Sequence, residues 1–331
     1  MPKGILERLV EGPVLGDGGY LLELEKRGYV QAGPFTPEVV IEHPDALAQL
    51  HREFLRAGAD VLQTMTFYAS DDKLATVGLE GKVDDINRNA VQIARLVAAE
   101  GDALVAGNLC LTWAYDPEDP ASADHVRALF DRQLQDQLDA GGVDFLIGET
   151  FSFVGEAILF VERAKATGLP VMATMCFEQP VPVSYEGDAP ADCARKLADA
   201  GADIVGVNCL SGPEQMLPID IEMRGAVSGY VAAQPVAYRT TAEQPDFTAT
   251  GNFPYELDPL QLSRKEMADF ARGADDAGIN YIGSCCGSVQ GHVRAMAKVI
   301  GKLPADEREW KSSTGKAMSA YEYREHSETE V

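Results

Sequence analysis

Residues 142–177 decide the fold, and they read GVDFLIGETFSFVGEAILFVERAKATGLPVMATMCF. Two short apolar runs, 144–151 and 170–177, flank a stretch at 154–167 whose apolar residues recur at helical spacing. Thr167-Gly168 closes that stretch, and glycine is typical of the left-handed position that ends a helix. The segment therefore predicts a strand, a helix and a second strand in the same parallel sheet.

The same unit recurs along the chain. Six further apolar runs of this kind occupy 13–19, 60–67, 103–110, 203–210, 235–240 and 281–287. Helical patterns fill most of the intervals between them, at 43–57, 83–100, 123–140, 190–200, 263–277 and 290–300. Eight strands alternating with helices predict an α/β fold, a (β/α)8 TIM barrel. We expect it to form a single domain at 1–304, followed by a short polar C-terminal tail at 305–331.

An open, doubly wound sheet is the alternative architecture. It is disfavoured because no Gly-x-Gly-x-x-Gly opens a first helix, and residues 16–19 read GDGG, which lacks that spacing. The barrel interpretation is also supported by five helix ends. In each of them a glycine stands directly before an expected strand, at positions 58, 141, 168, 201 and 278.

The chain carries a large excess of acidic residues. Its 331 residues contain 28 Lys and Arg against 52 Asp and Glu, a formal net charge of −24. Such a chain is repelled by phosphate backbones and anionic membrane surfaces, which argues against nucleic-acid or membrane partners. No apolar run reaches the ~18 residues needed to span a bilayer, and the N-terminus lacks the apolar segment of a signal peptide. We therefore expect a cytoplasmic protein.

Thiol and polar side chains stand where the expected strands end, which is where a barrel of this type carries its chemistry. They are Asp17, Thr64, Asn108, Cys110, Glu149, Cys176, Asn208, Cys209, Cys285 and Cys286. The ends of strands six and eight can converge above the barrel, which would bring Cys209, Cys285 and Cys286 together. Three thiolates are a strong zinc ligand set, and three protein ligands leave the fourth position of a catalytic zinc open.

Other interpretations of these cysteines stay open at this point. Adjacent Cys285 and Cys286 would point to opposite faces of a regular strand, so both reach one metal only if the backbone leaves β geometry. Gly283 and Gly287 give the chain that freedom. Buried cysteines are often plain packing residues. A vicinal disulfide is a further alternative, and two other cysteines, at 110 and 176, also end strands.

A zinc ion on three thiolates suits thiol chemistry better than water activation. A free thiol has a pKa of about 8.5, so little of it is ionised at neutral pH. Metal binding removes the proton while the sulfur remains nucleophilic. The reaction that this arrangement suggests is attack by a substrate thiolate on an electrophilic carbon, with methyl or alkyl transfer as the simplest case.

The chain resembles the homocysteine S-methyltransferase family over roughly residues 10–300. The combination of GVNC with Gly-x-Cys-Cys-Gly is highly specific, whereas a lone Cys-Cys would not be. The segments that carry the resemblance include GDGGYLLELEKRGYVQAGPFTPE (16–38), HREFLRAGADVLQTMTFYASDDKL (51–74), GVDFLIGETF (142–151), GVNCL (206–210) and YIGSCCG (281–287).

The resemblance implies an enzyme with a catalytic Zn²⁺ on the three cysteines and homocysteine bound to the zinc through sulfur. Asp17 and Glu149 would hold the polar end of homocysteine, and Glu149 is counted with the catalytic residues. Thr64 and Asn208 are further substrate-binding candidates. For Asn208, which stands beside Cys209, a support role and a plain strand-end hydrogen bond are both open.

The resemblance also implies an onium methyl donor held by aromatic rings through cation–π attraction, with methionine as product. Tyr68 matches the donor-pocket tyrosine of the family. Phe35 and Thr150 stand where its betaine-using members carry tryptophan and tyrosine. The expected donor is glycine betaine or a related betaine or sulfonium, such as dimethylsulfoniopropionate or S-methylmethionine.

Two other functions stay open. In the first, a corrinoid protein supplies the methyl group to the thiol substrate. In the second, the chain is a non-catalytic zinc-binding barrel. A structural zinc is usually closed by a fourth protein ligand, and no histidine stands at an expected strand end, because His292 falls in a helical pattern. We expect a monomer or a homodimer.

Overall fold

The computed structural model describes residues 3–31 and 33–303, and in them eight parallel strands form one sheet. The strand order is β1-β8-β7-β6-β5-β4-β3-β2. The Asp60 backbone N–H donates to the Leu15 carbonyl (2.8 Å), which links the two end strands and closes the ring. The strands are β1 (Val14–Leu15), β2 (Val61–Gln63), β3 (Leu104–Cys110), β4 (Phe145–Phe151), β5 (Val171–Met175), β6 (Ile204–Asn208), β7 (Tyr230–Gln234) and β8 (Tyr281–Ile282).

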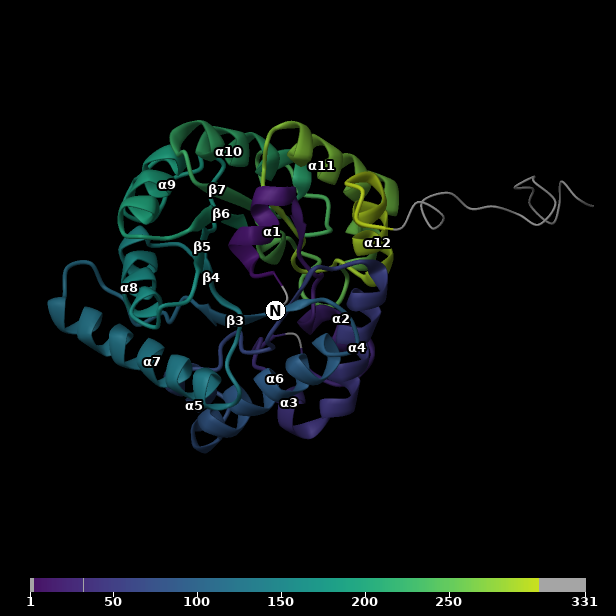
Figure 1. Cartoon of the computed structure of the whole chain (residues 1–331). Coiled ribbons are helices and arrows are strands. Elements are labelled where there is room, and N and C mark those ends of the chain that lie inside the picture. Colours follow the sequence, from purple (N-terminus) through teal and green to yellow (C-terminus); the bar gives the residue numbers. More distant parts are fainter. Residues whose placement is uncertain (1–2, 32, 304–331) are drawn as a thin grey trace, which may run out of the picture.

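Helices surround the strands, as Figure 1 shows, and the single-domain (β/α)8 barrel predicted from the sequence is confirmed. Within the described ranges, no helix has the length and apolar character needed to cross a membrane. The α-helices are α1 (Ile5–Glu11), α2 (Leu21–Lys26), α3 (Val39–Glu42), α4 (Pro44–Ala57), α5 (Asp71–Ala75), α6 (Val83–Ala98), α7 (Pro120–Asp139), α8 (Val154–Lys165), α9 (Pro190–Asp199), α10 (Pro213–Ala226), α11 (Arg264–Asp276) and α12 (Gln290–Val299). Three 3₁₀ turns are η1 (Glu80–Lys82), η2 (Phe247–Ala249) and η3 (Asp258–Leu260).

Side-chain alternation along the strands builds two cores. On β4, Phe145 and Ile147 belong to the core inside the barrel, whereas Leu146 packs outward against the helices. The inner core also contains Ile5 and Leu9 of α1, which lies across the middle of the ring in Figure 1. Since α1 precedes β1, it covers the N-terminal end of the barrel and leaves the opposite end for the site.

Several details differ from the sequence-based expectation. The seventh strand is β7, at Tyr230–Gln234, and not 235–240, because Pro235 has no N–H to continue the ladder. The eighth strand ends at Ile282, so the cysteine pair lies in a loop. Five helices have no counterpart among the predicted helical patterns, namely α1, α2, α3, α5 and α10. Of these, α10 carries Pro218 in its interior, which disfavours a helix. The predicted tail, 305–331, lies outside the described residues.

Candidate active site

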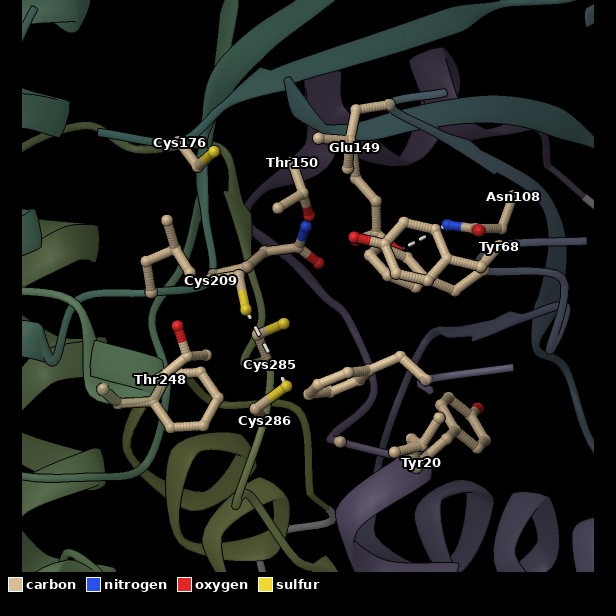
Figure 2. A pocket seen from close by; sticks show the side chains of 18 of the residues that line it. Tyr20, Tyr68, Asn108, Glu149, Thr150, Cys176, Cys209, Thr248, Cys285 and Cys286 are labelled. Carbon is tan, nitrogen blue, oxygen red and sulfur yellow. Dashed lines mark hydrogen bonds between the residues drawn. The ribbon is translucent and has the colours of Figure 1, made fainter. Parts of the chain in front are cut away.

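Three cysteine sulfurs meet at the C-terminal end of the barrel (Figure 2). The Sγ atoms of Cys209, Cys285 and Cys286 all lie within 4.8 Å of one another, and those of Cys209 and Cys286 are 3.8 Å apart. A hydrogen bond with Cys209, together with burial, raises the pKa of Cys285 well above its ordinary value. A cation between the sulfurs would favour the thiolate forms. The cluster therefore fits a metal ion that prefers sulfur ligands.

Irregular backbone brings the sulfurs together. Cys209 follows β6 with a left-handed φ of 59°. Cys285 donates its backbone N–H to the Pro235 carbonyl (2.8 Å), and the Cys286 carbonyl accepts from the Ala237 N–H (2.9 Å). The segment predicted as strand seven therefore serves as the support of the cysteine loop.

Glycines let this loop pack closely. Gly287 has a left-handed φ of 77°, and a Cβ there would lie 2.4 Å from the ring of Tyr238. Gly283 is needed for space and not for a left-handed turn, because a Cβ there would lie 2.9 Å from a side-chain oxygen on β7. A Cβ on Gly19 would lie 2.7 Å from the Cys285 carbonyl oxygen. The GDGG turn after β1 thus packs directly against the cysteine loop.

Two buried carboxylates lie beside the same cavity. Asp17 is 3% exposed, and its Oδ2 accepts from the Tyr20 hydroxyl and from the Gln63 backbone N–H (2.7 Å). Glu149 is 7% exposed, and its Oε1 accepts from Gln63 Nε2 (2.8 Å) and Asn108 Nδ2 (2.6 Å). Burial raises the pKa of Asp17 from 3.8 to about 7 and that of Glu149 from 4.5 to about 7. Gln63 links the two carboxylates, and such a pair suits a cationic group of a substrate.

Asn208 supports the site from behind. Its Nδ2 donates to Glu149 Oε2 (3.2 Å) and to Thr150 Oγ1 (2.8 Å). Its Oδ1 accepts from the Thr150 N–H and from Thr174 Oγ1, both at 2.8 Å. Asn208 is fully buried and does not line the cavity, so the structure places it behind Glu149. Thr64 does line the cavity.

The cavity has a volume of about 440 Å³ and an aromatic wall. Tyr68 and Trp113 meet edge to face, with ring centroids 5.1 Å apart. Phe35 stacks on Phe253, with centroids 5.7 Å apart and planes 4° from parallel. Thr150 also lines this space. The predicted donor-pocket residues, at 35, 68 and 150, therefore reach the cavity that the cysteines and carboxylates share.

Two further carboxylates line the cavity, and sequence reasoning did not find them. Glu178 accepts from Ser152 Oγ (2.9 Å) and from the Tyr185 hydroxyl, and Asp246 accepts from the Thr248 N–H (2.8 Å). Neither carboxylate forms an ion pair with another described residue. Among the cavity-lining residues that the structure describes, there is no Lys, Arg or His. The walls therefore favour a cationic ligand.

Backbone strain is concentrated around this cavity. Residues other than glycine seldom adopt positive φ, and such strain gathers at functional sites. In the described ranges six of them do, with φ between 56° and 64°, and all six line the cavity. They are Phe35, Tyr68, Trp113, Thr150, Cys209 and Leu210.

The remaining cysteines stay outside the cluster. Cys110 accepts the Tyr68 backbone N–H (3.2 Å) and does not line the cavity. Cys176 lines it but contacts Ser152 Oγ (3.3 Å), and Figure 2 shows its sulfur apart from the other three. Burial raises the pKa of Cys176 to about 12. Cys193 is buried in α9, as expected for a packing residue.

Three residues near the carboxylates and rings were given no role from the sequence. Gln63 and Asn108 hold the carboxylates. Asn108 was named only as a strand-end residue, and Gln63 was not named. Lys73 is buried, and its Nζ lies 4.3 Å from the Tyr68 ring centroid. Burial lowers the pKa of Lys73 from 10.5 to about 7.

Known proteins resemble this chain in sequence and in fold. The family model of homocysteine S-methyltransferase matches residues 14–300. A betaine–homocysteine S-methyltransferase 1 of Danio rerio is 47% identical over 316 residues, which cover 90% of this chain and 76% of the relative. An S-methylmethionine–homocysteine S-methyltransferase of Pongo abelii is 44% identical over 310 residues, covering 90% and 81%.

A solved structure shares the fold. The metallated form of the homocysteine methyltransferase MmuM from Escherichia coli matches with a TM-score of 0.70 at 22% identity, over 88% of this chain and 98% of that one. The resemblance inferred from the sequence motifs is thereby confirmed at the level of the family. The chain belongs to the homocysteine S-methyltransferase family, a family of S-methyltransferase enzymes.

Proposed function

We propose that this protein transfers a methyl group from a small onium donor to the thiol of homocysteine and so forms methionine. The observation that carries the proposal is the position of the cysteine cluster. Its three sulfurs line one cavity together with the buried carboxylates Asp17 and Glu149 and an aromatic wall. A thiol substrate with a cationic end and a cationic methyl donor therefore find complementary groups in one space.

Cys209, Cys285 and Cys286 would hold a zinc ion. Their sulfurs are close enough to share one metal, and an all-thiolate set favours zinc over metals that prefer oxygen ligands. When bound, zinc supplies a stabilised thiolate at neutral pH by lowering the pKa of the substrate thiol.

Asp17 and Glu149 would bind the α-ammonium of homocysteine. Both are buried, and both carry a raised pKa in the free protein. An ammonium between them offsets the unfavourable burial of their charges. Gln63, which donates to both, fixes the separation of the carboxylates and hence the position of the homocysteine chain.

The aromatic wall would hold the donor. Tyr68 and Phe35 line the cavity, and aromatic rings attract an onium cation. The carboxylates Glu178 and Asp246 add negative charge to the cavity. The described lining residues include no Lys, Arg or His that would pair with a carboxylate on the methyl donor. Because Thr150 is small, a bulkier onium than glycine betaine also finds room. We infer that a sulfonium with its own ammonium group, of the S-methylmethionine type, is preferred over glycine betaine.

The transfer needs no redox step. The homocysteine thiol first loses its proton to solvent. The thiolate sulfur then attacks the methyl carbon in line, a carbon–sulfur bond forms, and the bond from that carbon to the onium nitrogen or sulfur breaks. The electron pair of the broken bond stays on the nitrogen or sulfur of the leaving group, and that atom becomes neutral. Charge is neutralised in the transition state, and the apolar rings that exclude water favour such a step. Holding both substrates in one cavity supplies the orientation.

The acidic charge of the chain supports a further proposal. A net charge of −24 argues against nucleic-acid and membrane partners, and we propose a cytoplasmic location. We also propose a monomer or a homodimer. Light scattering that found a tetramer would overturn that assignment.

A methionine-formation assay tests the function. Zinc-loaded protein and homocysteine are incubated with glycine betaine, proline betaine, dimethylsulfoniopropionate, S-methylmethionine or adenosylmethionine. Turnover with an onium donor other than adenosylmethionine supports the proposal. Bound zinc without turnover on any donor refutes it and points to a corrinoid-protein donor or to a non-catalytic barrel.

A further inference from the structure

A buried histidine stands behind Asp17 with a single polar partner. His51 lies on α4 and is fully buried. Its Nδ1 lies 2.9 Å from the Tyr20 hydroxyl, whereas its Nε2 has no hydrogen-bond partner among the described residues. Burial lowers the pKa of His51 from 6.5 to about 3, so the ring is neutral. Within the ranges that the structure describes, the contact with Tyr20 is therefore the one polar interaction that explains a histidine at this position.

Tyr20 connects this histidine to the cavity. Its hydroxyl donates to Asp17 Oδ2, and its ring meets that of His51 edge to face, with centroids 5.0 Å apart. Tyr20 lines the cavity, as Figure 2 shows, and so does Asp17, whereas His51 does not. The three side chains thus form a hydrogen-bonded chain that runs from α4 to the carboxylate.

The direction of this chain follows from the number of hydrogens. A tyrosine hydroxyl has one hydrogen, and in Tyr20 that hydrogen goes to Asp17. The Tyr20 oxygen can then only accept from His51, so the single proton of the neutral imidazole lies on Nδ1. Each hydrogen bond of a chain polarises the next, so His51 strengthens the bond from Tyr20 to Asp17.

The chain fixes one oxygen of Asp17 and leaves the other open. Oδ2 accepts from the Tyr20 hydroxyl and from the Gln63 backbone N–H (2.7 Å). Oδ1 accepts from no described residue, yet it is not among the enclosed polar atoms that lack a partner, so it borders the cavity that Asp17 lines. With two donors on Oδ2, the carboxylate cannot turn without breaking a buried hydrogen bond. Oδ1 is therefore held toward the cavity.

We propose that His51 is a positioning residue, which acts through the Tyr20 hydroxyl to hold Asp17 Oδ1 toward the α-ammonium of the thiol substrate. The inference rests on the proposed function, because that function gives Asp17 its ligand. His51 itself contacts no substrate. Without its Nδ1–H, the Tyr20 oxygen loses a donor and the hydroxyl holds Asp17 less firmly. The affinity for a thiol with an amino group then falls, whereas the affinity for a thiol without one does not.

Calorimetric titration of the full-length, zinc-loaded protein measures this effect without a methyl donor. Each variant is titrated with homocysteine and with 4-mercaptobutyrate, which has the same chain and carboxylate but no amino group. The measured quantity is the ratio of the two dissociation constants. His51→Leu should reduce the preference for homocysteine about threefold, as for one neutral hydrogen bond, and Tyr20→Phe about tenfold, as for a hydrogen bond to a charged group.

Two comparisons identify the route of the effect. His51→Asn should restore most of the preference, because its amide N–H reaches the position of Nδ1, whereas the amide of His51→Gln reaches that of Nε2 and should not. In a Tyr20→Phe background, His51→Leu should cause no further loss, since the hydroxyl on which it acts is gone.

Phe54→Leu is the matched control. Phe54 lies on the same helix and packs edge to face on Tyr20, with centroids 5.3 Å apart, without a hydrogen bond to it. This variant should lower the melting temperature and leave the ratio of dissociation constants unchanged, because the hydrogen-bonded chain is intact.

The outcomes separate the inference from the proposed function. Zinc content and a thermal melt establish that each variant is folded, and His51→Gln replaces His51→Leu if the latter does not fold. A wild-type ratio in the folded variant, a loss that His51→Asn does not restore, or an equal loss in the Tyr20→Phe background overturns the role of His51 alone. Wild-type protein that binds zinc but does not prefer homocysteine overturns the ammonium site of the proposed function, and the inference with it.

Discussion

Replacing Asp17 by asparagine should stabilise the free protein at pH 8 and weaken homocysteine binding. Burial raises the Asp17 pKa from 3.8 to about 7, so the folded protein binds this proton more tightly than the unfolded chain. The stability that this group contributes is fully present below about pH 4 and is lost as the pH rises through about 7. That difference in pKa corresponds to about 4 kcal/mol, an upper limit because water in the cavity solvates part of the charge.

Asparagine removes the charge and keeps the shape. Both hydrogen bonds from Tyr20 and Gln63 go to one oxygen of Asp17, and the amide oxygen of asparagine can accept them. Asp17→Asn should therefore exceed the wild type in unfolding free energy by up to about 4 kcal/mol at pH 8, or about 6 °C in Tm for a chain of this length. The gain should vanish near pH 4. Homocysteine should bind about 30-fold more weakly, because its ammonium loses a buried charged partner.

Calorimetric melts of ligand-free protein at pH 4.5 and pH 8 measure the first effect, and titration with homocysteine measures the second. Asp246→Asn is the matched control, since Asp246 lines the same cavity but is half-buried. It should change the melt little at either pH. An Asp17→Asn protein that is less stable than the wild type at pH 8, or whose gain is the same at both pH values, would refute the account of Asp17 as a buried charge.

Four further substitutions test the metal site and the donor side of the cavity. Cys285→Ala should lose bound zinc and methyltransferase activity together, whereas Cys176→Ala should keep both. Elemental analysis measures the zinc and the methionine assay measures the activity. Zinc retained by Cys285→Ala contradicts the ligand assignment. Tyr68→Ala should raise the donor KM about tenfold with unchanged zinc content, since one cation–π face is lost; an unchanged KM removes Tyr68 from the donor pocket. Glu178→Gln should lower the ratio of kcat/KM for S-methylmethionine to kcat/KM for glycine betaine. An unaltered ratio argues that the charge of Glu178 does not select the methyl donor.

Periodicity was sufficient to predict the barrel. Parallel strands that are buried on both faces have nearly continuous apolar sequences, which are easy to recognise. The residue that ends a helix often adopts a left-handed φ, which favours glycine. All five glycines predicted at helix ends, from Gly58 to Gly278, have left-handed φ in the structure. The C-terminal position of the chemistry follows from the architecture, which is why the strand-end residues converge on one cavity.

Other features could not be predicted because local sequence does not encode them. Helix α10 contains an internal proline, which has a very low helix propensity. Tertiary packing overrides this local preference. The left-handed turn at Cys209 has no glycine to announce it, since the surrounding structure imposes the strain. Glu178 and Asp246 stand in loops, and only the fold shows that they share a cavity with Tyr68.

The site is unfavourable in the free protein in three independent ways. Six residues around the cavity have strained backbone, at about 1–3 kcal/mol each. Asp17 and Glu149 are buried with raised pKa values, and Asn108 keeps an unpaired oxygen. A cation in the cavity relieves the burial of the two carboxylates, whereas the backbone strain remains. A thiol substrate with an ammonium group supplies that cation in the same cavity as the three cysteines. The raised pKa values of the two buried carboxylates and the ammonium group of the proposed methyl acceptor, homocysteine, are therefore complementary.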